Sequence, residues 1–558
     1  MPSPTRVDDI DLSPLPGKTY FNITREWREE FIYFLLVDRF HDDSLRGPVR
    51  RSGRSAGISV PSDFYGGTIR GITQNLDYIA GLGCTAIWLS PIFENNPRAY
   101  HGYDINNYLD VDPHFGTKQD LVDLVEAAHR RNPPMRVILD VVINHSGDNW
   151  AYPGGFPYYY ANDQQFDFGF WRRPDRPIPE ELCREHLYHR RGEISSSGYD
   201  VYPENQHGDI SALKDYANDD DVAGSELINI LIRAHCYWIR EADVDGFRVD
   251  AVKHMGELAC SRFCSNIREF AYSLGKRRFF LFGEVATPRD EIMDRYIGPN
   301  SSRQEGGKTV FFGLDSVLDF RLAGELRWVI KGFRDPAVLF ERLEAQRNRA
   351  LNRGEIGRYL VTFADNHDSF WQPTGRIANG APDEQVIGMV GHLLCALGTP
   401  CIYYGTEQGF EGRGGDNEMR EAMFDKTTPG RNLLNTDCTL YKEIAQIARV
   451  MRSNEALRFG RMYFRQISGD GVHFGLSYGN AYTLAFSRLL YPREVLVAYN
   501  VSDRSRSDYV IVEASLHKPG DVMHFLYGGV GSVKVEPAPD GAVCVRLDLN
   551  ARQFVILQ

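Results

Sequence analysis

The strongest constraint on the fold is a repeated alternation of short apolar segments with helical patterns, from about residue 30 to residue 455. Strands separated by helices are typical of a parallel sheet, and eight such units can close into a barrel covered by helices. The eight segments that we expect to be strands are 31–38, 85–89, 136–142, 246–250, 279–284, 316–320, 359–364 and 400–404. The sequence therefore predicts an α/β fold built on a (β/α)8 TIM barrel.

Two regions interrupt or follow this alternation. Residues 146–213, after the third expected strand, are rich in aromatic side chains and too long for a simple loop, so we expect an inserted domain there. After residue 458 short alternating strands with turn residues replace the helices, which predicts a C-terminal antiparallel β-sandwich domain at 458–558. The barrel is then formed by residues 1–145 and 214–457.

Two helices are marked clearly in the first part of the barrel. Thr117 precedes an amphipathic stretch and has an acidic residue three positions later, as in a capping box. Ile72, Leu76 and Ile79 would share one face of another helix, which we expect to stop at Gly81.

Composition restricts the partners. The chain has 558 residues, 75 acidic against 63 basic, and a formal charge of −12, which argues against nucleic acid or an anionic membrane. No apolar run approaches the roughly 20 residues of a membrane span, and no signal peptide is visible at the N-terminus. Nine cysteines, several of them within apolar runs, are expected to be free thiols. We therefore expect a cytoplasmic protein.

The segment Gly246-Phe-Arg-Val-Asp250 places a guanidinium and a carboxylate on one face of a buried strand. Two charges at such a place cost several kcal/mol to desolvate unless they are paired. The segment alone fits a structural ion pair between Arg248 and Asp250 as well as it fits a functional site.

Three further apolar runs, 137–145, 279–284 and 359–368, also end in polar groups. In this order and spacing, the four segments resemble the signature regions of the α-amylase family of glycoside hydrolases. The resemblance implies a retaining (β/α)8-barrel enzyme that acts on α-glucans and carries a domain after the third strand, with no organic cofactor.

Retaining hydrolysis of a glycosidic bond needs two carboxyl groups about 5 Å apart. The fourth and fifth strands would bring Asp250 and Glu284 together at one mouth of the barrel. The resemblance implies that Asp250 is the nucleophile, that Glu284 is the general acid/base, and that Asp368 holds the sugar's 2- and 3-hydroxyls. Without the motif, Asp368 would be interpreted as a helix N-cap. Arg248 is expected to keep Asp250 ionised.

The resemblance also implies a set of substrate-binding residues, with Tyr103 as an aromatic platform beneath the sugar. This set comprises His101, Tyr103, His145, Arg248, Lys253, His254, His367 and Trp371. Lys253 and His254 resemble the variant found in enzymes acting on α-1,4 bonds. Trp371 and the loop 409–415 are where we expect acceptor subsites. A core tyrosine, hydrogen-bonded core histidines and a solvated lysine are the competing interpretations.

Calcium is a candidate cofactor through the same resemblance. Asn144, Asp209 and the backbone carbonyl of His254 correspond to three oxygen ligands of the family's metal site. Ca²⁺ takes roughly 6 to 8 oxygen ligands, and Asp163 and Asp167 are the only further candidates that we can name.

Three functions remain open at this point. The first is hydrolysis of α-1,4-linked α-glucans or oligosaccharides. The second uses the same acids as a 4-α-glucanotransferase (transglycosylase) or as an exo-acting α-glucosidase. The third is a non-catalytic barrel, which would be expected to lack at least one of the three acids, whereas Asp250, Glu284 and Asp368 are all present. Oligomeric state is not predicted.

Overall fold

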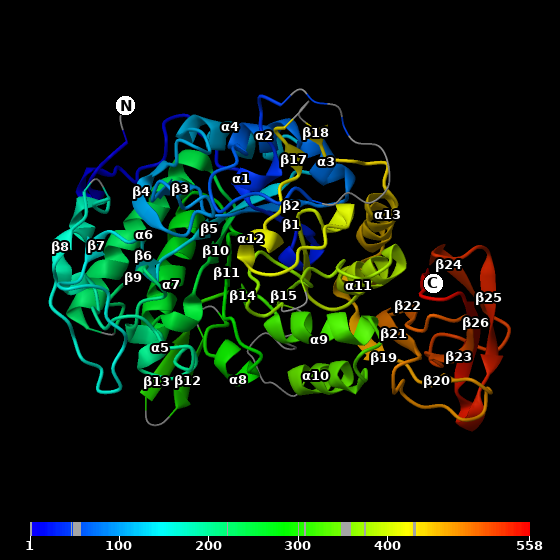
Figure 1. Cartoon of the computed structure of the whole chain (residues 1–558). Helices are drawn as coiled ribbons and strands as arrows, with labels where there is room; N and C mark the ends of the chain where they lie inside the picture. Colours follow the sequence, from blue (N-terminus) through cyan, green and yellow to red (C-terminus); the bar gives the residue numbers. More distant parts are fainter. Residues whose placement is uncertain are drawn as a thin grey trace.

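The computed structural model describes residues 3–45, 47, 49, 57–173, 175–219, 221–298, 301–305, 308–347, 359–372, 375–427 and 431–558. Its centre is a sheet of eight parallel strands in the order β14-β11-β10-β5-β2-β1-β16-β15 (Figure 1). The strands are β1 (Ile32–Leu35), β2 (Ala86–Leu89), β5 (Arg136–Val141), β10 (Gly246–Val249), β11 (Phe280–Gly283), β14 (Ser316–Val317), β15 (Val361–Thr362) and β16 (Thr399–Tyr403). A parallel bridge between Leu318 and Val361 joins the two ends of this order, so the sheet closes. The eight predicted strands and the barrel are confirmed.

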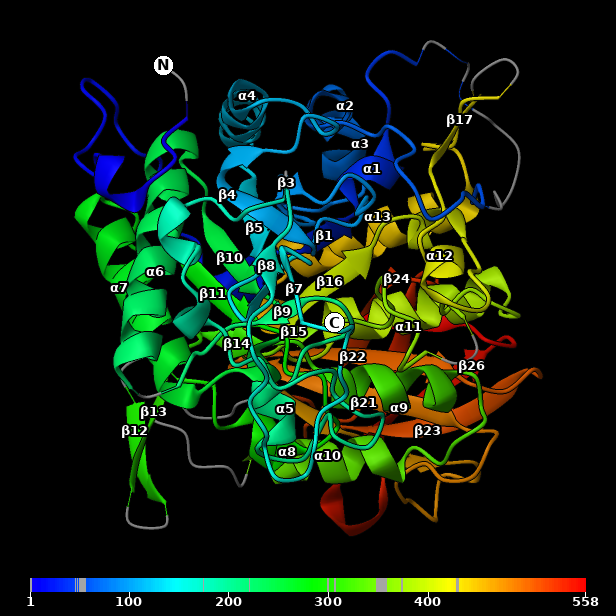
Figure 2. The same ribbon diagram turned by 60° about the vertical axis from the view of Figure 1, so that its left-hand side comes forward.

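Helices surround the strands on the outside (Figures 1 and 2). The longer ones are α2 (Ile69–Gln74), α3 (Leu76–Gly81), α4 (Lys118–His129), α6 (Val222–Ala242), α7 (Glu257–Ser273), α9 (Phe320–Ile330), α10 (Ala337–Arg347), α11 (Asp383–Cys395) and α13 (Thr439–Ser453). Shorter ones are α1 (Val37–Phe40), α8 (Asp290–Met293), α12 (Asp416–Met419) and α14 (Glu455–Phe459). Strands covered in this way are buried on both faces, which explains their continuous apolar runs.

The two helix predictions had different outcomes. Thr117 caps α4 and forms a reciprocal capping box with Asp120, as predicted. The single helix through Ile72 and Ile79 is wrong, because the chain leaves helical geometry at Asn75 (φ −114°, ψ 20°) and divides into α2 and α3. The Asn75 side chain donates to the carbonyl of Gly71 instead, a local bond that competes with the helix.

Segment 146–213 leaves the barrel and returns to it at one place. There β6 (His145–Ser146) pairs with β9 (Lys214–Asp215) in antiparallel fashion. Between them lie β7 (Trp150–Ala151), β8 (Phe170–Trp171), the 3-10 helices η3 (Glu180–Leu182) and η4 (Glu185–Leu187), and α5 (Glu204–His207). With so little regular structure, the segment is held by aromatic packing, in which Trp150 contacts Tyr152, Phe168 and Tyr188.

The C-terminal region forms a nine-stranded antiparallel arrangement in the order β19-β21-β22-β27-β24-β25-β26-β23-β20. Its strands are β19 (Arg461–Phe464), β20 (Ile467–Ser468), β21 (Thr483–Leu490), β22 (Arg493–Asn500), β23 (Arg506–Val512), β24 (Val522–Tyr527), β25 (Ser532–Pro537), β26 (Val543–Leu549) and β27 (Phe554–Leu557). Leu496, Val510, Met523, Val545 and Val555 share one buried core, so the arrangement folds over on itself.

This C-terminal region packs tightly on the barrel through α11. A Cβ atom added to Gly388 would lie 2.6 Å from the ring of Tyr499, and one added to Gly391 would lie 2.8 Å from the ring of Phe554. The buried guanidinium of Arg488 donates to the carbonyl of Cys395 at 2.7 Å and to that of Gly460 at 2.9 Å. Glycine is therefore needed at both helix positions for the two parts to approach this closely.

The remaining elements are short. They are β3 (Phe93–Asn95) with β4 (Ile105–Val111), β12 (Ser301–Glu305) with β13 (Lys308–Phe312), β17 (Phe424–Asp425) with β18 (Arg431–Asn432), and the 3-10 helices η1 (Val7–Asp9), η2 (Trp27–Glu29), η5 (Val252–His254), η7 (Thr406–Gln408) and η8 (Pro539–Gly541). All nine cysteines are free thiols, and all but Cys183 are buried. Within the described ranges no helix has both the length and the apolar character needed to cross a membrane.

Candidate active site

Two predicted acids lie at the carboxyl ends of neighbouring strands. Asp250 follows β10 directly and Glu284 follows β11, and the two strands pair in register with Val249 opposite Gly283. The carboxyl ends of parallel barrel strands meet at one mouth. The side chains of Asp250 and Glu284 are 10% and 12% exposed, so both can be reached from solvent.

Arg248 links the two acids. Its Nη1 donates to Asp250 Oδ1 at 2.6 Å, and its Nη2 lies 3.0 Å from Glu284 Oε2. The guanidinium is fully buried, which would be costly without these partners. Arg248 therefore forms an ion pair with Asp250 and also holds both acids in place. The structural ion pair and the functional site, the two interpretations of this segment from the sequence, are thus compatible.

A third carboxylate, Asp140 at the end of β5, supports the arginine from the opposite side. Its Oδ1 accepts from Arg248 Nη1 at 2.9 Å, and its Oδ2 accepts from Trp88 Nε1 at 3.1 Å and from the Tyr103 hydroxyl at 3.0 Å. Arg248, Trp88 and Tyr103 all donate to this carboxylate, so Asp140 fixes the position of the guanidinium. Sequence reasoning missed this role, although Asp140 lies within one of the four motif segments.

Asp250 Oδ1 and Glu284 Oε2 contact two nitrogens of the same guanidinium, at 2.6 Å and 3.0 Å, so the two carboxyl groups lie close together. A retaining enzyme needs its two carboxyl groups about 5–5.5 Å apart, whereas an inverting one needs roughly 6.5–9.5 Å to admit a water molecule. Burial raises the pKa of Asp250, and the charge of Glu284 raises it further. Burial also acts to raise the pKa of Glu284, but Arg248 and the Ala251 N–H together lower it. These shifts favour the proton on Asp250 and the ionised form of Glu284, although Arg248 lowers both pKa values, so the expectation that Arg248 keeps Asp250 ionised is not met. The two groups titrate as a pair, and the roles that the family motif implies require the proton on Glu284.

Asp368 belongs to the same site. Its Oδ1 lies 3.2 Å from Arg420 Nη2 and 3.4 Å from His367 Nε2. Burial raises the pKa of Asp368 to about 7 against the opposing charge of Arg420, and the charge of Glu284 contributes to the rise. In the part of the chain that the structure describes, no helix begins at Asp368, so the alternative interpretation as an N-cap is wrong.

Tyr103 stacks on His367 with ring centres 5.3 Å apart and an interplanar angle of 6°. The backbone N–H of Tyr103 donates to Nδ1 of His101 at 3.1 Å. Burial lowers the pKa of both His101 and His145 to about 3, so these imidazoles are neutral. Within the part of the chain that the structure describes, Nε2 of His145 and Nδ1 of His367 are buried without a hydrogen-bond partner. Such groups need a partner, and a substrate hydroxyl would provide one.

Lys253 and His254 lie in η5, immediately after Asp250, and contact the inserted segment. Lys253 Nζ is 2.8 Å from Asp200 Oδ1, and His254 Nδ1 donates to the carbonyl of Asn205 at 2.6 Å. Burial lowers the pKa of His254 to about 4. A hollow of about 460 Å³ borders this place and is lined in part by Asp200, Asn205 and Lys253.

Trp371 packs within the loop that carries the third acid. Its indole N–H donates to Asn366 Oδ1 at 2.9 Å, and its ring meets Phe320 and Phe363 edge-on. Asn366 in turn accepts from the N–H of Asp368 at 3.0 Å. The structure therefore places Trp371 in support of Asp368, in addition to any contact with substrate.

Arg420 is a second residue that sequence reasoning missed. Besides Asp368, it contacts the carbonyl of His367 at 3.0 Å and Asp416 at 3.4 Å. It lies just after the short helix α12, in a loop without apolar periodicity. No sequence pattern indicates Arg420, because its contacts form only when the loop after α12 packs against the segment that carries His367 and Asp368.

The residues predicted as calcium ligands do not form an open oxygen cage. Both oxygens of Asp209 already accept hydrogen bonds, one from the Tyr152 hydroxyl at 2.6 Å and one from the Asp215 N–H at 2.9 Å. The Asn144 Oδ1 accepts from the Asn218 amide at 3.5 Å, and exposed Asp167 has no contact with Asn144 or Asp209 among the described interactions. Asp163, the other candidate, pairs with His207. This donor set does not fit Ca²⁺, which needs roughly 6 to 8 oxygens.

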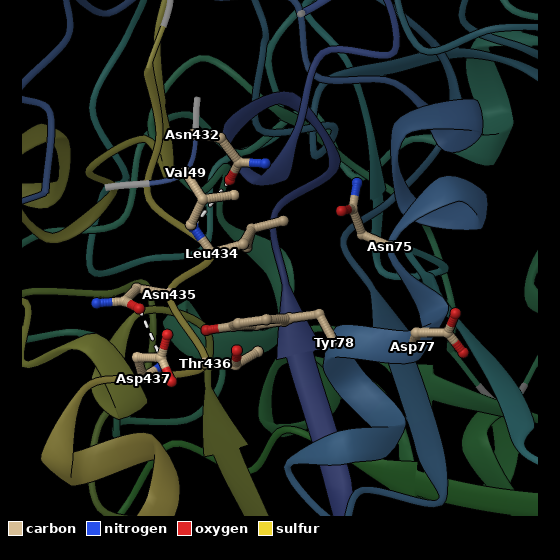
Figure 3. Close-up of a pocket in the computed structure, with 9 residues that line it drawn as sticks. All are labelled: Val49, Asn75, Asp77, Tyr78, Asn432, Leu434, Asn435, Thr436 and Asp437. Carbon is tan, nitrogen blue, oxygen red and sulfur yellow. Dashed lines mark hydrogen bonds between the residues drawn. The ribbon is translucent and has the colours of Figure 1, made fainter. Parts of the chain in front are cut away.

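A separate hollow of about 330 Å³ lies on another part of the barrel (Figure 3). Asn75, Tyr78, Asn432 and Asn435 are among its lining residues, and none of the three acids is. The Tyr78 hydroxyl donates to the buried Glu407 at 2.6 Å, so this tyrosine serves the barrel interior. The hollow is not part of the site around Asp250.

The fold and the site together define a closed (β/α)8-barrel protein with Asp250, Glu284 and Asp368 at the mouth, where Arg248 joins the first two of these acids and also contacts Asp140. The family model described as alpha amylase, catalytic domain, matches residues 34–437, and the chain belongs to the α-amylase family.

Individual relatives agree with this assignment. An α-amylase from Streptomyces lividans is 30% identical over 87% of this chain, and the match covers 58% of that protein. A cyclomaltodextrin glucanotransferase from Klebsiella oxytoca is 26% identical over 86% of this chain and is covered over 74% of its length. The crystal structure of an α-amylase from Geobacillus thermoleovorans complexed with acarbose is similar in fold, with a TM-score of 0.70 and 24% identity, over 96% of this chain and 99% of that one.

Proposed function

We propose that this protein is a retaining glycoside hydrolase that cleaves α-1,4-glucosidic bonds in α-glucans or malto-oligosaccharides. The observation that carries the proposal is the contact of both Asp250 and Glu284 with one buried guanidinium, that of Arg248. The family assignment supports the same chemistry.

In the proposed reaction, Asp250 attacks the anomeric carbon while Glu284 gives a proton to the departing glycosidic oxygen. The C–O bond to the leaving sugar breaks and a covalent glycosyl-enzyme forms on Asp250. Glu284, now ionised, removes a proton from water, and the water oxygen replaces Asp250 on the sugar. Asp368 holds two hydroxyls of the same sugar and stabilises the positive charge that develops on the ring.

The substrate class rests on three observations. The relatives include an α-amylase and a cyclomaltodextrin glucanotransferase, whose names point to α-glucans. The Lys253-His254 pair follows the nucleophile strand, as in the α-1,4 variant of the family motif. The unpartnered His145 and His367 nitrogens offer places for sugar hydroxyls beside the acids.

Transfer to a second sugar is the alternative function. It uses the same acids, with a sugar hydroxyl in place of water in the second half of the reaction. The observation that favours it is the hollow of about 460 Å³ beside Lys253, which is large enough for a sugar unit, although none of the three acids lines it. Exo-acting α-glucosidase activity is a third use of the same machinery.

Maltoheptaose tests these activities in one experiment. Only shorter products support hydrolysis, products longer than seven glucose units support transfer, and glucose as the sole first product supports exo-action. The Asp250→Asn variant serves as the control, because it removes the attacking group and leaves the other contacts in place. Absence of any product with the wild-type protein would refute the proposal.

Calcium is not included in this proposal, because the residues named as ligands supply fewer than the roughly 6 to 8 oxygens that Ca²⁺ takes. The mechanism above requires no metal.

A further inference from the structure

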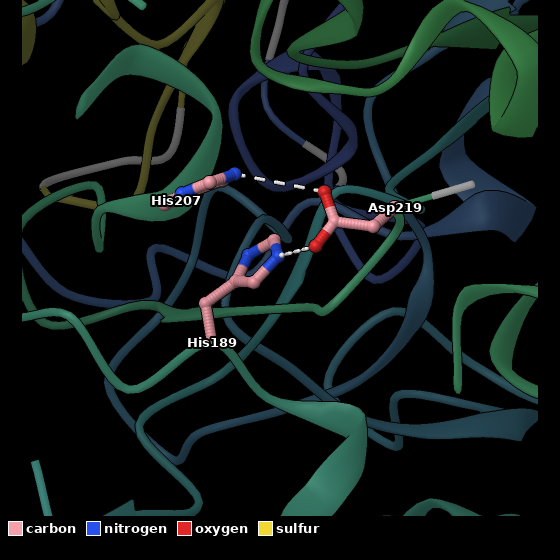
Figure 4. A group of neighbouring side chains, drawn as sticks. All are labelled: His189, His207 and Asp219. Carbon is pink, nitrogen blue, oxygen red and sulfur yellow. Dashed lines mark hydrogen bonds and ion pairs between the residues drawn. The ribbon is translucent and has the colours of Figure 1, made fainter. Parts of the chain in front are cut away.

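A cluster of two histidines and one aspartate lies where the inserted segment returns to the barrel (Figure 4). His189 follows η4, His207 ends α5, and Asp219 precedes α6. His189 Nε2 lies 3.0 Å from Asp219 Oδ2, and His207 Nε2 lies 3.6 Å from Asp219 Oδ1. The two imidazole rings are 4.6 Å apart, so three different parts of the chain meet at this point.

The outer nitrogens of both imidazoles are held by other carboxylates. His189 Nδ1 lies 2.5 Å from Asp215 Oδ2, and His207 Nδ1 lies 3.0 Å from Asp163 Oδ2. A carboxylate on one ring nitrogen fixes the tautomer and leaves the other nitrogen as a ligand, an arrangement typical of histidines bound to zinc. Both Nε2 atoms therefore face the Asp219 carboxylate.

Among the described residues, one of these nitrogens lacks a hydrogen-bond partner. His207 is 9% exposed, and its buried Nε2 has no such partner in the described ranges, because 3.6 Å to Asp219 is beyond hydrogen-bond distance. A buried imidazole nitrogen normally has a partner. An ion between the three groups would satisfy this nitrogen and the carboxylate at once.

The spacing also suits a small cation. Ligands about 2.0–2.1 Å from a tetrahedral zinc ion lie about 3.3 Å from one another. The two nitrogen–oxygen distances, 3.0 and 3.6 Å, fall on either side of that value. The Asp219 side chain is 45% exposed, so an ion could enter from solvent and keep water in its fourth position.

We propose that His189, His207 and Asp219 form a binding site for one Zn²⁺ ion. Two imidazoles with one carboxylate favour a borderline metal such as zinc, whereas Ca²⁺ and Mg²⁺ prefer oxygen ligands. The site is separate from the three acids at the barrel mouth, and it does not depend on the proposed glycosidase activity.

The ion would hold α5 against η5, the short helix that follows Asp250. In this short helix, Asn205 accepts from His254 at 2.6 Å, and Gln206 donates to the carbonyl of Met255 at 3.1 Å. These contacts lie four and five residues after Asp250. Zinc at His207 would hold one end of α5, and through it the inserted segment, in position at the barrel mouth.

The test uses the full chain after removal of metals with a chelator and exhaustive dialysis. Calorimetric titration with ZnCl₂ should show one site per chain, and CaCl₂ or MgCl₂ should not compete. Co²⁺ added to the stripped protein should give the visible absorption of a tetrahedral ion. His207→Gln and Asp219→Asn should lose this binding, while Asp163→Asn should weaken it by about 10- to 100-fold, because it removes only the support of a ligand.

His186→Gln is the matched control, since His186 is a nearby surface histidine paired with Glu226 at 2.9 Å and should bind zinc as the wild type does. Zinc affinity that is the same in the His207 and Asp219 variants as in the wild type, or lost in the His186 control, would overturn the proposal. If a ligand variant does not fold, the test depends on the wild-type protein alone. Absence of one-to-one zinc binding and of the tetrahedral Co²⁺ spectrum in the wild type would also overturn the proposal.

Discussion

Replacing Arg420 by methionine should shift the pH dependence of activity toward alkaline pH. Arg420 is a buried cation 3.2 Å from Asp368, and the pKa of that carboxyl is about 7 in its presence. An opposite charge at such a distance typically lowers a carboxyl pKa by about 1 to 3 units, so its loss should raise the pKa of Asp368 to about 8 to 10.

The expected loss of activity follows from the raised pKa of Asp368. Asp368 is neutral below its pKa and cannot then stabilise a positively charged transition state. At pH 7 about half of the wild-type protein has Asp368 ionised, whereas a pKa of 8 to 10 leaves about 10% to 0.1% ionised, a loss of about 5- to 500-fold in kcat/KM. Activity should recover as the pH rises through the new pKa.

The assay is kcat/KM on maltoheptaose between pH 5 and 10 for the wild type, Arg420→Met and Arg420→Lys. The lysine variant keeps the charge and should retain most of the wild-type profile, although it cannot reproduce the contacts with His367 and Asp416. If the methionine variant loses activity equally at every pH, Arg420 acts only through packing and the electrostatic argument is wrong.

Three further changes test other parts of the structure. Asp250→Asn should lower turnover on maltoheptaose by several orders of magnitude and leave its calorimetric affinity within a few fold; an unchanged rate would show that Asp250 is not the nucleophile. Glu284→Gln should be inactive on maltoheptaose yet still react with α-glucosyl fluoride, because fluoride leaves without a proton; equal losses on both substrates would contradict a role in acid catalysis. Thr117→Ala removes a helix cap and should cost about 1 kcal/mol in urea unfolding, with no change in kcat; a stability equal to that of the wild type would show that the cap contributes nothing.

The barrel could be predicted from the sequence because its strands are buried on both faces. Each strand is a continuous apolar run between polar turns. This pattern can be recognised in the sequence without information on any tertiary contact. The break at Asn75 could not be predicted from apolar spacing, since residues on either side keep the helical period while one side-chain bond interrupts the backbone.

The same contrast applies to the site. Asp250 and Glu284 end strands, so the topology alone brings them together. Asp140 and Arg420 act by contacting other side chains across the barrel mouth, and such contacts leave no local pattern in the sequence. The packing of Trp371 against Phe320 and Phe363 was hidden for the same reason.

The two glycines in α11 determine how the chain can be divided. The rings of Tyr499 and Phe554 pack directly against Gly388 and Gly391 of α11. A chain ending at residue 457 would therefore expose this part of α11 to solvent. It would also leave the carbonyl of Cys395 without the buried Arg488. The C-terminal sheet thus covers this side of the barrel and cannot be removed without exposing buried groups. Heating should therefore unfold the barrel and the C-terminal sheet in a single transition.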